Sequence, residues 1–442
     1  MKKSLIKISL IMIVVVLSVG LYLYKAEPDF IVDRFYEQIY SERLPAEPEV
    51  LLNETPVFFD RAVESWSIQK NNGEWYTPPS NPESTDQNKY EPKPVAVATS
   101  HEDKFMVSVD KPPDSVRLTV IKTDSGQSLL DETVVLPNIA LPKQNGSFLY
   151  QLTLEWTGES DPYRGEYVLE IPMTADLPEK FTFSAETLRQ GQLLEIMVDY
   201  ADDANDIVFE QSIYNKFRWH QLDGSLRGYL PTNYNVNPGV YEIKYGVKSE
   251  GTEATQKIQV VSHDYQIQYL IVDPKTEQET RNDAAYAEYY KYYTPVRNQS
   301  EPTRYYTDSF LWPVDGKLTT EFGETRYVND LPTTYRHQGL DLAAPTGTEI
   351  KATNRGKVVL ARSLILTGNT IMIDHGEGLF SVYHHMQSLS VDLGDIVERG
   401  QLIGTVGSTG FSTGPHLHFM ISYYTTSLEP GYFLVGEPIT YD

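Results

Sequence analysis

Short runs of alternating apolar and polar residues between positions 47 and 275 constrain the fold of this chain more than any other feature. Residues 105–109, 116–121, 150–156 and 167–171 are examples, with turn-forming residues between such runs. Successive side chains of a β-strand point to opposite faces of a sheet, so this alternation predicts half-buried strands. No long helical period interrupts the runs. The pattern therefore predicts β-sandwiches.

A weak internal repeat divides this region in two. The pattern Gly-x-Tyr followed by alternation begins at Gly165 and again at Gly239. We interpret each Gly as the end of a turn and each Tyr as the start of a late strand. This predicts two modules, residues 47–176 and 177–275, whose pattern resembles immunoglobulin-like modules. We expect them to act as spacers or to dock envelope protein partners.

The N-terminal residues predict a membrane anchor. Lysines at positions 2, 3 and 7 precede an uncharged, mostly apolar run over residues 8–24, about 26 Å long as a helix and just enough to cross a bilayer. The lysine bias predicts a signal anchor over residues 1–27, a single pass through the cell membrane with the remaining chain outside. A cleaved signal peptide, which would make the protein secreted, and a buried core helix are the alternatives. Residues 28–46 are expected to form a juxtamembrane helix or linker.

Charge and cysteine content exclude several classes of protein. The 442 residues carry a formal charge of −24, which makes the chain a poor candidate for binding nucleic acid. The chain has no cysteine, so disulfide scaffolds, thiol nucleophiles and cysteine-based metal sites are excluded. Histidine and carboxylate side chains must therefore hold any metal ion.

Residues 276–297 change to helix-forming composition and carry an aromatic stripe. Tyr286, Tyr289, Tyr290 and Tyr293 follow the spacing i, i+3, i+4, i+7, which places them on one helix face. We expect this face to pack against a neighbouring domain, with a glycan-binding aromatic platform as the alternative. Pro295 should end the helix. Residues 276–307 are therefore predicted to be a helical linker.

Histidines cluster near the C-terminus in a pattern that suits a metal. Six of the nine histidines fall between residues 337 and 418. His337 and Asp341 are four residues apart, in a segment that Gly339 and Pro345 favour as extended. His416 and His418 would share one face of a strand, since their spacing is two. His337, Asp341 and one of the last pair form an N, O, N donor set that suits zinc with one position open for water.

Residues 311–423 resemble the lysostaphin-type zinc endopeptidases that cut peptidoglycan cross-bridge peptides. The resemblance covers about a quarter of the chain, and its motifs occur in the family's order. The matching segments are residues 312–323, 337–348, 368–376, 383–386, 391–404 and 408–419. The resemblance implies a small antiparallel β fold with a long groove over one zinc ion per chain, and a peptidase domain over residues 308–442.

The same resemblance implies roles for individual residues. His337, Asp341 and His418 would be the zinc ligands, and His385 and His416 the catalytic histidines, with the choice of general base left open. Strand alternation would place His384 on the face opposite His385, in a structural or exposed position. His375 is also expected to be structural. D-Ala–diaminopimelate, D-Ala–Lys and oligoglycine bonds all remain candidate substrates.

Three other classes of function compete with the peptidase. A catalytically silent envelope regulator of the same fold would lose ligands, whereas all of them are present here. A purely adhesive wall-binding protein would explain the β-modules but not the histidines. A carrier domain of the biotinyl or lipoyl type would need a modifiable lysine at a hairpin tip, and none is evident. The sequence therefore favours a metalloprotease, a cell-wall hydrolase acting on peptidoglycan peptides.

Overall fold

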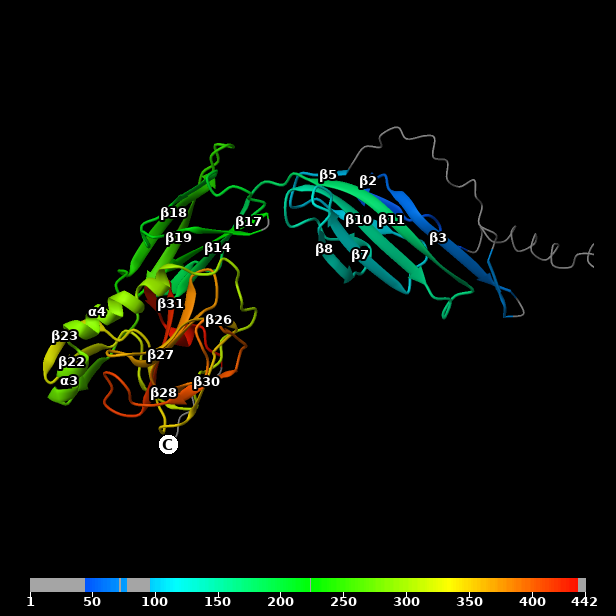
Figure 1. Ribbon diagram of the computed structural model, residues 1–442. Helices are drawn as coiled ribbons and strands as arrows, with labels where there is room; N and C mark the ends of the chain where they lie inside the picture. The colour runs from blue at the N-terminus through cyan, green and yellow to red at the C-terminus, as the bar shows by residue number, and fades with distance from the viewer. Residues whose placement is uncertain (1–43, 71–72, 78–95, 223, 436–442) are drawn as a thin grey trace, which may run out of the picture. The chain divides into compact units, whose positions relative to one another are not determined.

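In the described part of the protein, the regular secondary structure is mainly β-strand, with a few short helices (Figure 1). The computed structural model describes residues 44–70, 73–77, 96–222 and 224–435. The prediction of a mainly β chain is confirmed. The predicted signal anchor and nearly all of the juxtamembrane segment lie outside the described residues. Within the described part of the chain, no helix is both long enough and apolar enough to cross a membrane.

The chain separates into two compact units, residues 1–178 and 179–442. Unit 1 contains a four-stranded sheet in the order β2–β1–β6–β9 and a larger sheet in the order β4–β3–β11–β10–β7–β8, with β5 paired to β11. Its strands are β1 (Glu49–Leu52), β2 (Thr55–Pro56), β3 (Asp60–Gln69), β4 (Trp75–Tyr76), β5 (Ala96–Ala98), β6 (Phe105–Ser108), β7 (Ser115–Lys122), β8 (Ser128–Thr133), β9 (Asn138–Ile139), β10 (Gly146–Trp156) and β11 (Tyr163–Ala175).

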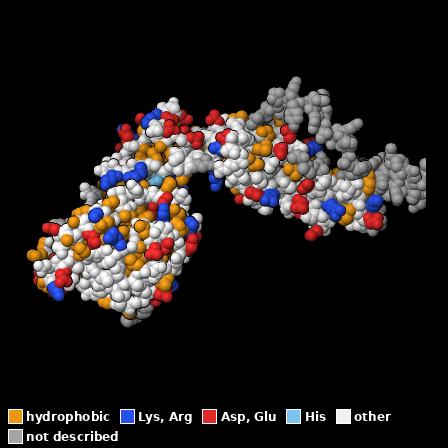
Figure 2. Space-filling model, in the orientation of Figure 1, with side chains coloured by type: hydrophobic (Ala, Val, Ile, Leu, Met, Phe, Trp, Pro, Cys, Tyr) orange, Lys and Arg blue, Asp and Glu red, His pale blue; other side chains and the backbone are white. Residues whose placement is uncertain are grey.

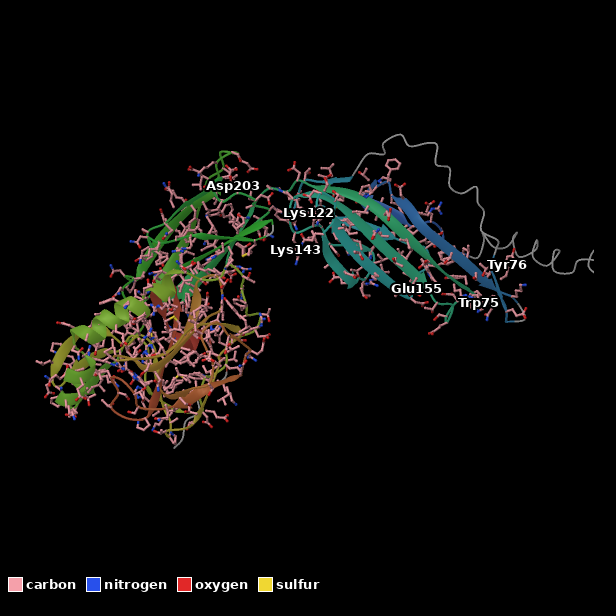
Figure 3. The ribbon with its side chains drawn as sticks, viewed as in Figure 1. Trp75, Tyr76, Lys122, Lys143, Glu155 and Asp203 are labelled. Carbon is pink, nitrogen blue, oxygen red and sulfur yellow. The ribbon has the colours of Figure 1, made fainter. Side chains whose placement is uncertain are left out.

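Aromatic residues fill the core of unit 1. The Phe105 ring on β6 meets the Tyr150 ring on β10 edge to face at 5.3 Å, which joins the two sheets. Trp66 and Trp156 lie 5.2 Å apart between ring centroids, and both are buried. At the edge of the larger sheet, Trp75 lies on β4 (Figure 3). The alternation along β10 and β11 thus separates a buried aromatic face from a more exposed one.

The interpretation of Gly165 as the end of a turn is wrong. Gly165 lies inside β11, directly opposite Trp66 of β3. A Cβ atom at this position would lie 2.2 Å from the Ser65 carbonyl oxygen, so the close approach of β3 requires a glycine here. Gly239, in contrast, begins a strand, as the pattern predicts.

The first part of unit 2 consists of two four-stranded sheets, in the orders β12–β14–β17–β16 and β13–β19–β18–β15. The strands are β12 (Lys180–Phe183), β13 (Thr187–Arg189), β14 (Leu193–Asp199), β15 (Ile207–Glu210), β16 (Trp219–Leu222), β17 (Ser225–Pro231), β18 (Gly239–Val247) and β19 (Ala254–Val261). The immunoglobulin-like arrangement and the predicted module boundaries remain predictions.

A three-stranded sheet and short helices connect this part to the C-terminal domain. The sheet has the order β20–β22–β23, formed by β20 (Ile267–Leu270), β22 (Thr325–Val328) and β23 (Leu331–Arg336). Between β20 and β22 the chain forms α3 (Pro274–Thr280), α4 (Asp283–Tyr292) and the 3-10 helix η1 (Pro295–Asn298). The α-helix ends before Pro295, as predicted, although a 3-10 turn follows it.

The C-terminal domain is a ten-stranded sheet whose main path is β21–β24–β31–β28–β27–β26–β29. Its elements are β21 (Lys317–Thr320), β24 (Leu340–Ala343), β25 (Glu349–Lys351), β26 (Gly356–Leu364), β27 (Gly368–Asp374), β28 (Leu379–Leu389), β29 (Ile396–Val397), β30 (Leu402–Val406), β31 (His416–Tyr423), β32 (Thr426–Leu428) and the 3-10 helix η2 (Pro430–Tyr432). Strands β24, β31 and β28 are neighbours, which brings three histidine- or aspartate-bearing strands together.

The two parts of unit 2 share one hydrophobic core. The Tyr229 ring on β17 lies 5.5 Å from the Tyr423 ring on β31. Arg227, also on β17, pairs with the buried carboxylate of Glu377 at 2.8 and 2.9 Å, and the Tyr229 hydroxyl donates to the same carboxylate at 2.8 Å. The strands of residues 179–261 therefore support the C-terminal domain directly.

Candidate active site

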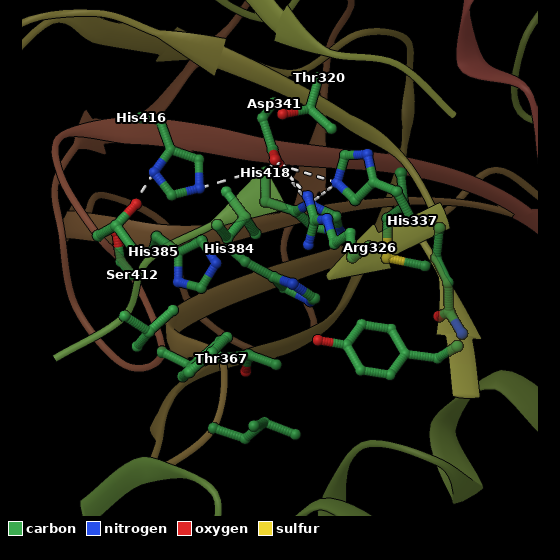
Figure 4. Close-up of a pocket in the computed structure, with 18 of the residues that line it drawn as sticks. Thr320, Arg326, His337, Asp341, Thr367, His384, His385, Ser412, His416 and His418 are labelled. Atoms are coloured by element: carbon green, nitrogen blue, oxygen red, sulfur yellow. Dashed lines mark hydrogen bonds and ion pairs between the residues drawn. The ribbon is translucent and has the colours of Figure 1, made fainter. Parts of the chain in front are cut away.

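A compact group of two histidines and one aspartate forms the centre of the candidate site (Figure 4). Asp341 on β24 and His418 on β31 lie directly opposite each other in the antiparallel register. His337 follows the last residue of β23. His337 Nε2 is 3.0 Å from Asp341 Oδ1 and 2.9 Å from His418 Nδ1, and His418 Nδ1 is 2.7 Å from Asp341 Oδ1. The structure thus brings the three predicted ligands together.

The donor chemistry of this group fits zinc. Its ligand atoms, two imidazole nitrogens and one carboxylate oxygen, all lie within 4.8 Å of one another. His337 Nδ1 is 2.8 Å from the Glu321 carbonyl oxygen, so this nitrogen carries the proton and Nε2 offers its lone pair to the group. Three protein ligands of this kind are the number found in catalytic rather than structural zinc sites.

Arg326 holds the second oxygen of the aspartate. Its Nη2 donates to Asp341 Oδ2 at 2.7 Å, and its Nε donates to Gln268 Oε1 at 2.9 Å. Gln268 in turn donates to Thr320 Oγ1 at 2.7 Å. Burial raises the pKa of Asp341, but the charges and hydrogen bonds of His337 and His418 outweigh burial and hold the pKa well below its usual value. Asp341 is therefore a carboxylate at neutral pH.

Two further histidines, His385 and His416, line the same cavity. Their ring centroids are 4.8 Å apart, and His416 Nε2 is 3.8 Å from Asp341 Oδ1. His385 Nδ1 lies 2.8 Å from the Thr409 carbonyl oxygen, and His416 Nδ1 lies 2.8 Å from that of Gly414. Each Nδ1 must therefore donate its proton to a carbonyl, which leaves each Nε2 as an acceptor.

Burial sets the protonation of these two rings. Burial, followed by the neighbouring histidines, lowers the pKa of His385 to about 3. Burial likewise lowers the pKa of His416 below its ordinary value. Both imidazoles are therefore neutral at pH 7 and able to accept a proton.

The prediction that His384 faces away from this site is wrong. Its ring stacks on the His418 ring at 5.1 Å and 17°, and its Nε2 is 3.2 Å from the Tyr293 hydroxyl. The cause is the backbone of His385, whose φ of 60° breaks the alternation of β28. His384 and His385 consequently line one cavity. A supporting role for the buried His384 ring remains a prediction.

His375 lies away from the cavity lining. Its Nδ1 donates to the Arg355 carbonyl oxygen at 2.7 Å, and its Nε2 is 2.8 Å from Ser381 Oγ. Burial lowers its pKa to about 4. A buried, doubly hydrogen-bonded and neutral ring is what a structural role requires.

The cavity over the site has a volume of about 820 Å³ and a wall that the sequence did not predict. β20, α4 and the residues on either side of α3, Val272 and Arg281, contribute part of the wall, so residues far before the histidine cluster reach the site. Of the tyrosine stripe, Tyr293 is buried while Tyr286, Tyr289 and Tyr290 line the cavity. The residues not anticipated from sequence include Gln268, Leu270, Val272, Arg281, Arg326, Tyr335 and Phe411. Their contributions depend on nonlocal pairing, for which the sequence carries no signal.

Comparison with known proteins agrees with this geometry. The profile of peptidase family M23 matches residues 335–430, which include His337, Asp341, His385, His416 and His418. The chain is 37% identical over 110 residues to the peptidoglycan DD-endopeptidase ShyA of Vibrio cholerae, a stretch that covers 24% of this chain and 26% of that protein. It is 36% identical over 120 residues to the murein hydrolase activator EnvC of Escherichia coli, covering 27% of each.

A solved structure shows a similar extent of match. The catalytic domain of the antimicrobial peptidase lysostaphin from Staphylococcus simulans is 34% identical, with a TM-score of 0.25, and covers 27% of this chain and 91% of that domain. The chain spans less than half the length of the curated relatives it matches. The match to the family profile, over residues 335–430, includes all five site residues. The C-terminal part of this chain is accordingly a peptidase M23 domain.

Proposed function

We propose that this protein is a zinc-dependent endopeptidase that hydrolyses peptide bonds in the stem or cross-bridge peptides of peptidoglycan. The observation that carries the proposal is the presence of two separate sets of side chains in one cavity. His337, Asp341 and His418 form a ligand group, while His385 and His416 offer Nε2 acceptors beside it. Relatives that carry this domain include a peptidoglycan DD-endopeptidase.

The chemistry divides between the metal and the protein. Zinc, when held by His337, Asp341 and His418, would supply Lewis-acid activation of water at neutral pH. A neutral imidazole at His385 or His416 accepts the water proton on Nε2, because its Nδ1 proton is already engaged with a carbonyl. The same Nε2 can later pass the proton to the leaving amine. The other ring can donate from Nε2 to the developing oxyanion only in its protonated form.

A non-enzymatic role is the rival proposal, as a catalytically silent envelope regulator or an adhesive wall-binding protein. The relative EnvC is a murein hydrolase activator. A regulator needs the scaffold but not a preserved ligand group. All three ligand positions are present here and lie within hydrogen-bonding distance of one another, which favours the enzyme.

We further propose that the protein acts on the outer side of the cell membrane. The support is the apolar run at residues 8–24, which would anchor the chain or, if cleaved, release it. The relatives include proteins of cell division and of peptidoglycan cleavage. Unit 1 and the β-strands of residues 179–261 would then space the peptidase from the membrane or bind envelope proteins.

The test is mass spectrometry of the products released from purified peptidoglycan by the full chain loaded with zinc. We expect peptide-bond products that a chelator abolishes and added zinc restores. Each of His337→Ala, Asp341→Ala and His418→Ala should lose zinc and activity together, because three ligands leave no spare. His385→Ala and His416→Ala should keep zinc and lose ~10²–10⁴-fold in rate.

Two results would contradict the proposal. One is a His418→Ala protein that keeps full zinc, which would remove the assigned ligand set. The other is a zinc-loaded wild-type protein that releases no peptide product from any peptidoglycan chemotype, which would leave the regulator as the better account.

A further inference from the structure

The arginine at the end of α3 reaches the cavity of the M23 domain from outside that domain. Arg281 caps the C-terminus of α3 and lines the cavity together with the site histidines. Its guanidinium carbon lies 4.9 Å from the centroid of the Tyr335 ring and 4.7 Å from that of the Phe411 ring. These two rings come from β23 and from the loop before β31. Arg281 is therefore held at a fixed place where three segments of the wall meet.

The charged lining of this cavity is mainly cationic. Its four charged side chains are those of Arg281, Arg326, Arg336 and Asp341. The chain as a whole is strongly acidic, with 61 acidic against 37 basic residues. On the face shown in Figure 2, acidic and basic side chains are interspersed. A cationic cavity in an acidic chain concentrates anionic groups of a substrate at the site.

Arg281 differs from the other two arginines in what it contacts. Arg326 is paired with Asp341 and also bonds Gln268. Arg336 also lies over aromatic rings, 4.9 Å from the Tyr265 centroid and 5.9 Å from that of Tyr234, but it donates to the Gly323 carbonyl oxygen as well. Among the described residues, the ion pairs and the side-chain hydrogen bonds to backbone carbonyls include none with Arg281, whose side chain contacts aromatic rings and tyrosine hydroxyls.

Contacts of this kind prepare a guanidinium for an anion. Stacking on aromatic rings restricts the rotamers of an arginine, while the N–H donors at the edge of its plane remain able to bind a carboxylate in a bidentate way. An aromatic environment also lowers the local dielectric and strengthens such a bond. The ligand that fits is therefore a free carboxylate on the peptide that occupies the cavity.

We propose that Arg281 binds a free carboxylate next to the scissile bond and so determines which cross-link is cut. This inference rests on the proposed peptidase function. Diaminopimelate carries a carboxylate beside the amine that forms its cross-link, whereas the side-chain amine of lysine has none beside it and an oligoglycine bridge has none along it. Arg281 thus selects cross-links that end in a diamino diacid.

The test uses two purified cross-linked stem-peptide dimers that differ only in whether this diaminopimelate carboxylate is free or amidated. Wild type should prefer the free carboxylate by roughly 10- to 100-fold in kcat/KM, the value of one hydrogen bond to a charged group. Arg281→Gln should lose that preference by slowing only on the free form, and Arg281→Lys should keep part of it. Arg355→Gln, which removes an exposed arginine paired with Glu398, is the matched control and should behave as wild type.

Other outcomes overturn the inference in recognisable ways. If Arg281→Gln loses kcat/KM equally on both dimers, Arg281 only holds Tyr335 and Phe411 in place. The zinc content and melting temperature of the variant would show whether the site had collapsed. If Arg281→Gln gains kcat/KM on both dimers, the Arg281 side chain at the end of α3 obstructs the groove instead of binding a carboxylate.

Failure of the proposed function would look different. If wild type cleaves neither dimer, calorimetry of both dimers binding to zinc-loaded His416→Ala tests carboxylate recognition separately from catalysis. Tighter binding of the dimer with the free carboxylate, lost when Arg281→Gln is added, would uphold the inference even though the protein is not an enzyme. Equal binding of the two dimers would overturn it.

Discussion

At the scale of single residues, the site depends on side chains that orient the ligand group as much as on the group itself. Arg326 donates to the Asp341 oxygen that points away from the two histidines. We expect Arg326→Gln to weaken zinc affinity by roughly 10- to 100-fold, the usual effect of losing a partner of a metal ligand. Competition with a chromophoric chelator measures this directly, and Arg326→Lys should recover part of the affinity.

The control for Arg326 is a guanidinium elsewhere on the same unit. Arg355→Gln should leave zinc affinity unchanged, since Arg355 pairs with Glu398 and does not line the cavity. An Arg326→Gln protein with wild-type zinc affinity would show that Asp341 does not need the hydrogen bond from Arg326 to bind the metal.

A second residue-scale prediction concerns His375 and pH. Its pKa is about 4 in the folded protein and about 6.5 when unfolded, so the unfolded state takes up the proton at higher pH. Stability contributed by the neutral ring is therefore present above pH 6.5 and lost as pH falls toward 4, by about 3 kcal/mol. A glutamine in His375→Gln can keep one donor and one acceptor but does not titrate. This variant should therefore lose less stability than wild type as the pH falls.

Urea denaturation at pH 7.5 and pH 4.5 measures the difference, with chelator present for both proteins so that zinc release does not contribute. Parallel losses of stability in wild type and His375→Gln would contradict the assignment of this pH dependence to His375.

At the scale of elements, the contact between β17 and the turn joining β27 to β28 ties the two parts of unit 2 together. Arg227 pairs there with Glu377, whose side chain is only 2% exposed. Arg227→Met should destabilise unit 2 by about 3–5 kcal/mol, because it leaves a buried charge without its partner. Thermal or urea unfolding followed by tyrosine fluorescence measures the loss.

Two variants make this measurement specific. Arg117→Met removes the exposed partner of Asp131 in unit 1 and should change stability little. Adding Glu377→Gln to Arg227→Met should recover part of the loss, since the uncompensated charge is then gone. No recovery would indicate that Arg227 acts through packing rather than charge.

Individual elements also show how far sequence reasoning reaches. The alternation along β10 and β31 could be predicted from the sequence because a strand imposes a period of two on its own residues. The placement of His384 could not be predicted in this way, because a single residue in the left-handed conformation, His385, breaks the alternation locally. Arg281 and Gln268 could not be assigned to the site at all, since tertiary contacts alone bring them to residues more than 50 positions later.

At the scale of the whole molecule, the division into two compact units predicts which fragments fold. The core of unit 2 is continuous from Leu188 to Leu434, and Tyr423 at its centre packs against Tyr214 and Tyr229. A fragment of residues 179–442 should therefore unfold cooperatively and bind zinc like the full chain. A fragment of residues 308–442, which holds all five site residues, should be markedly less stable, because removing the preceding strands exposes apolar surface around Tyr423. Thermal unfolding, zinc content and binding of a hydrophobic dye compare the two fragments. Equal stability of the two would show that the strands of residues 179–261 rest on the peptidase domain without supporting it.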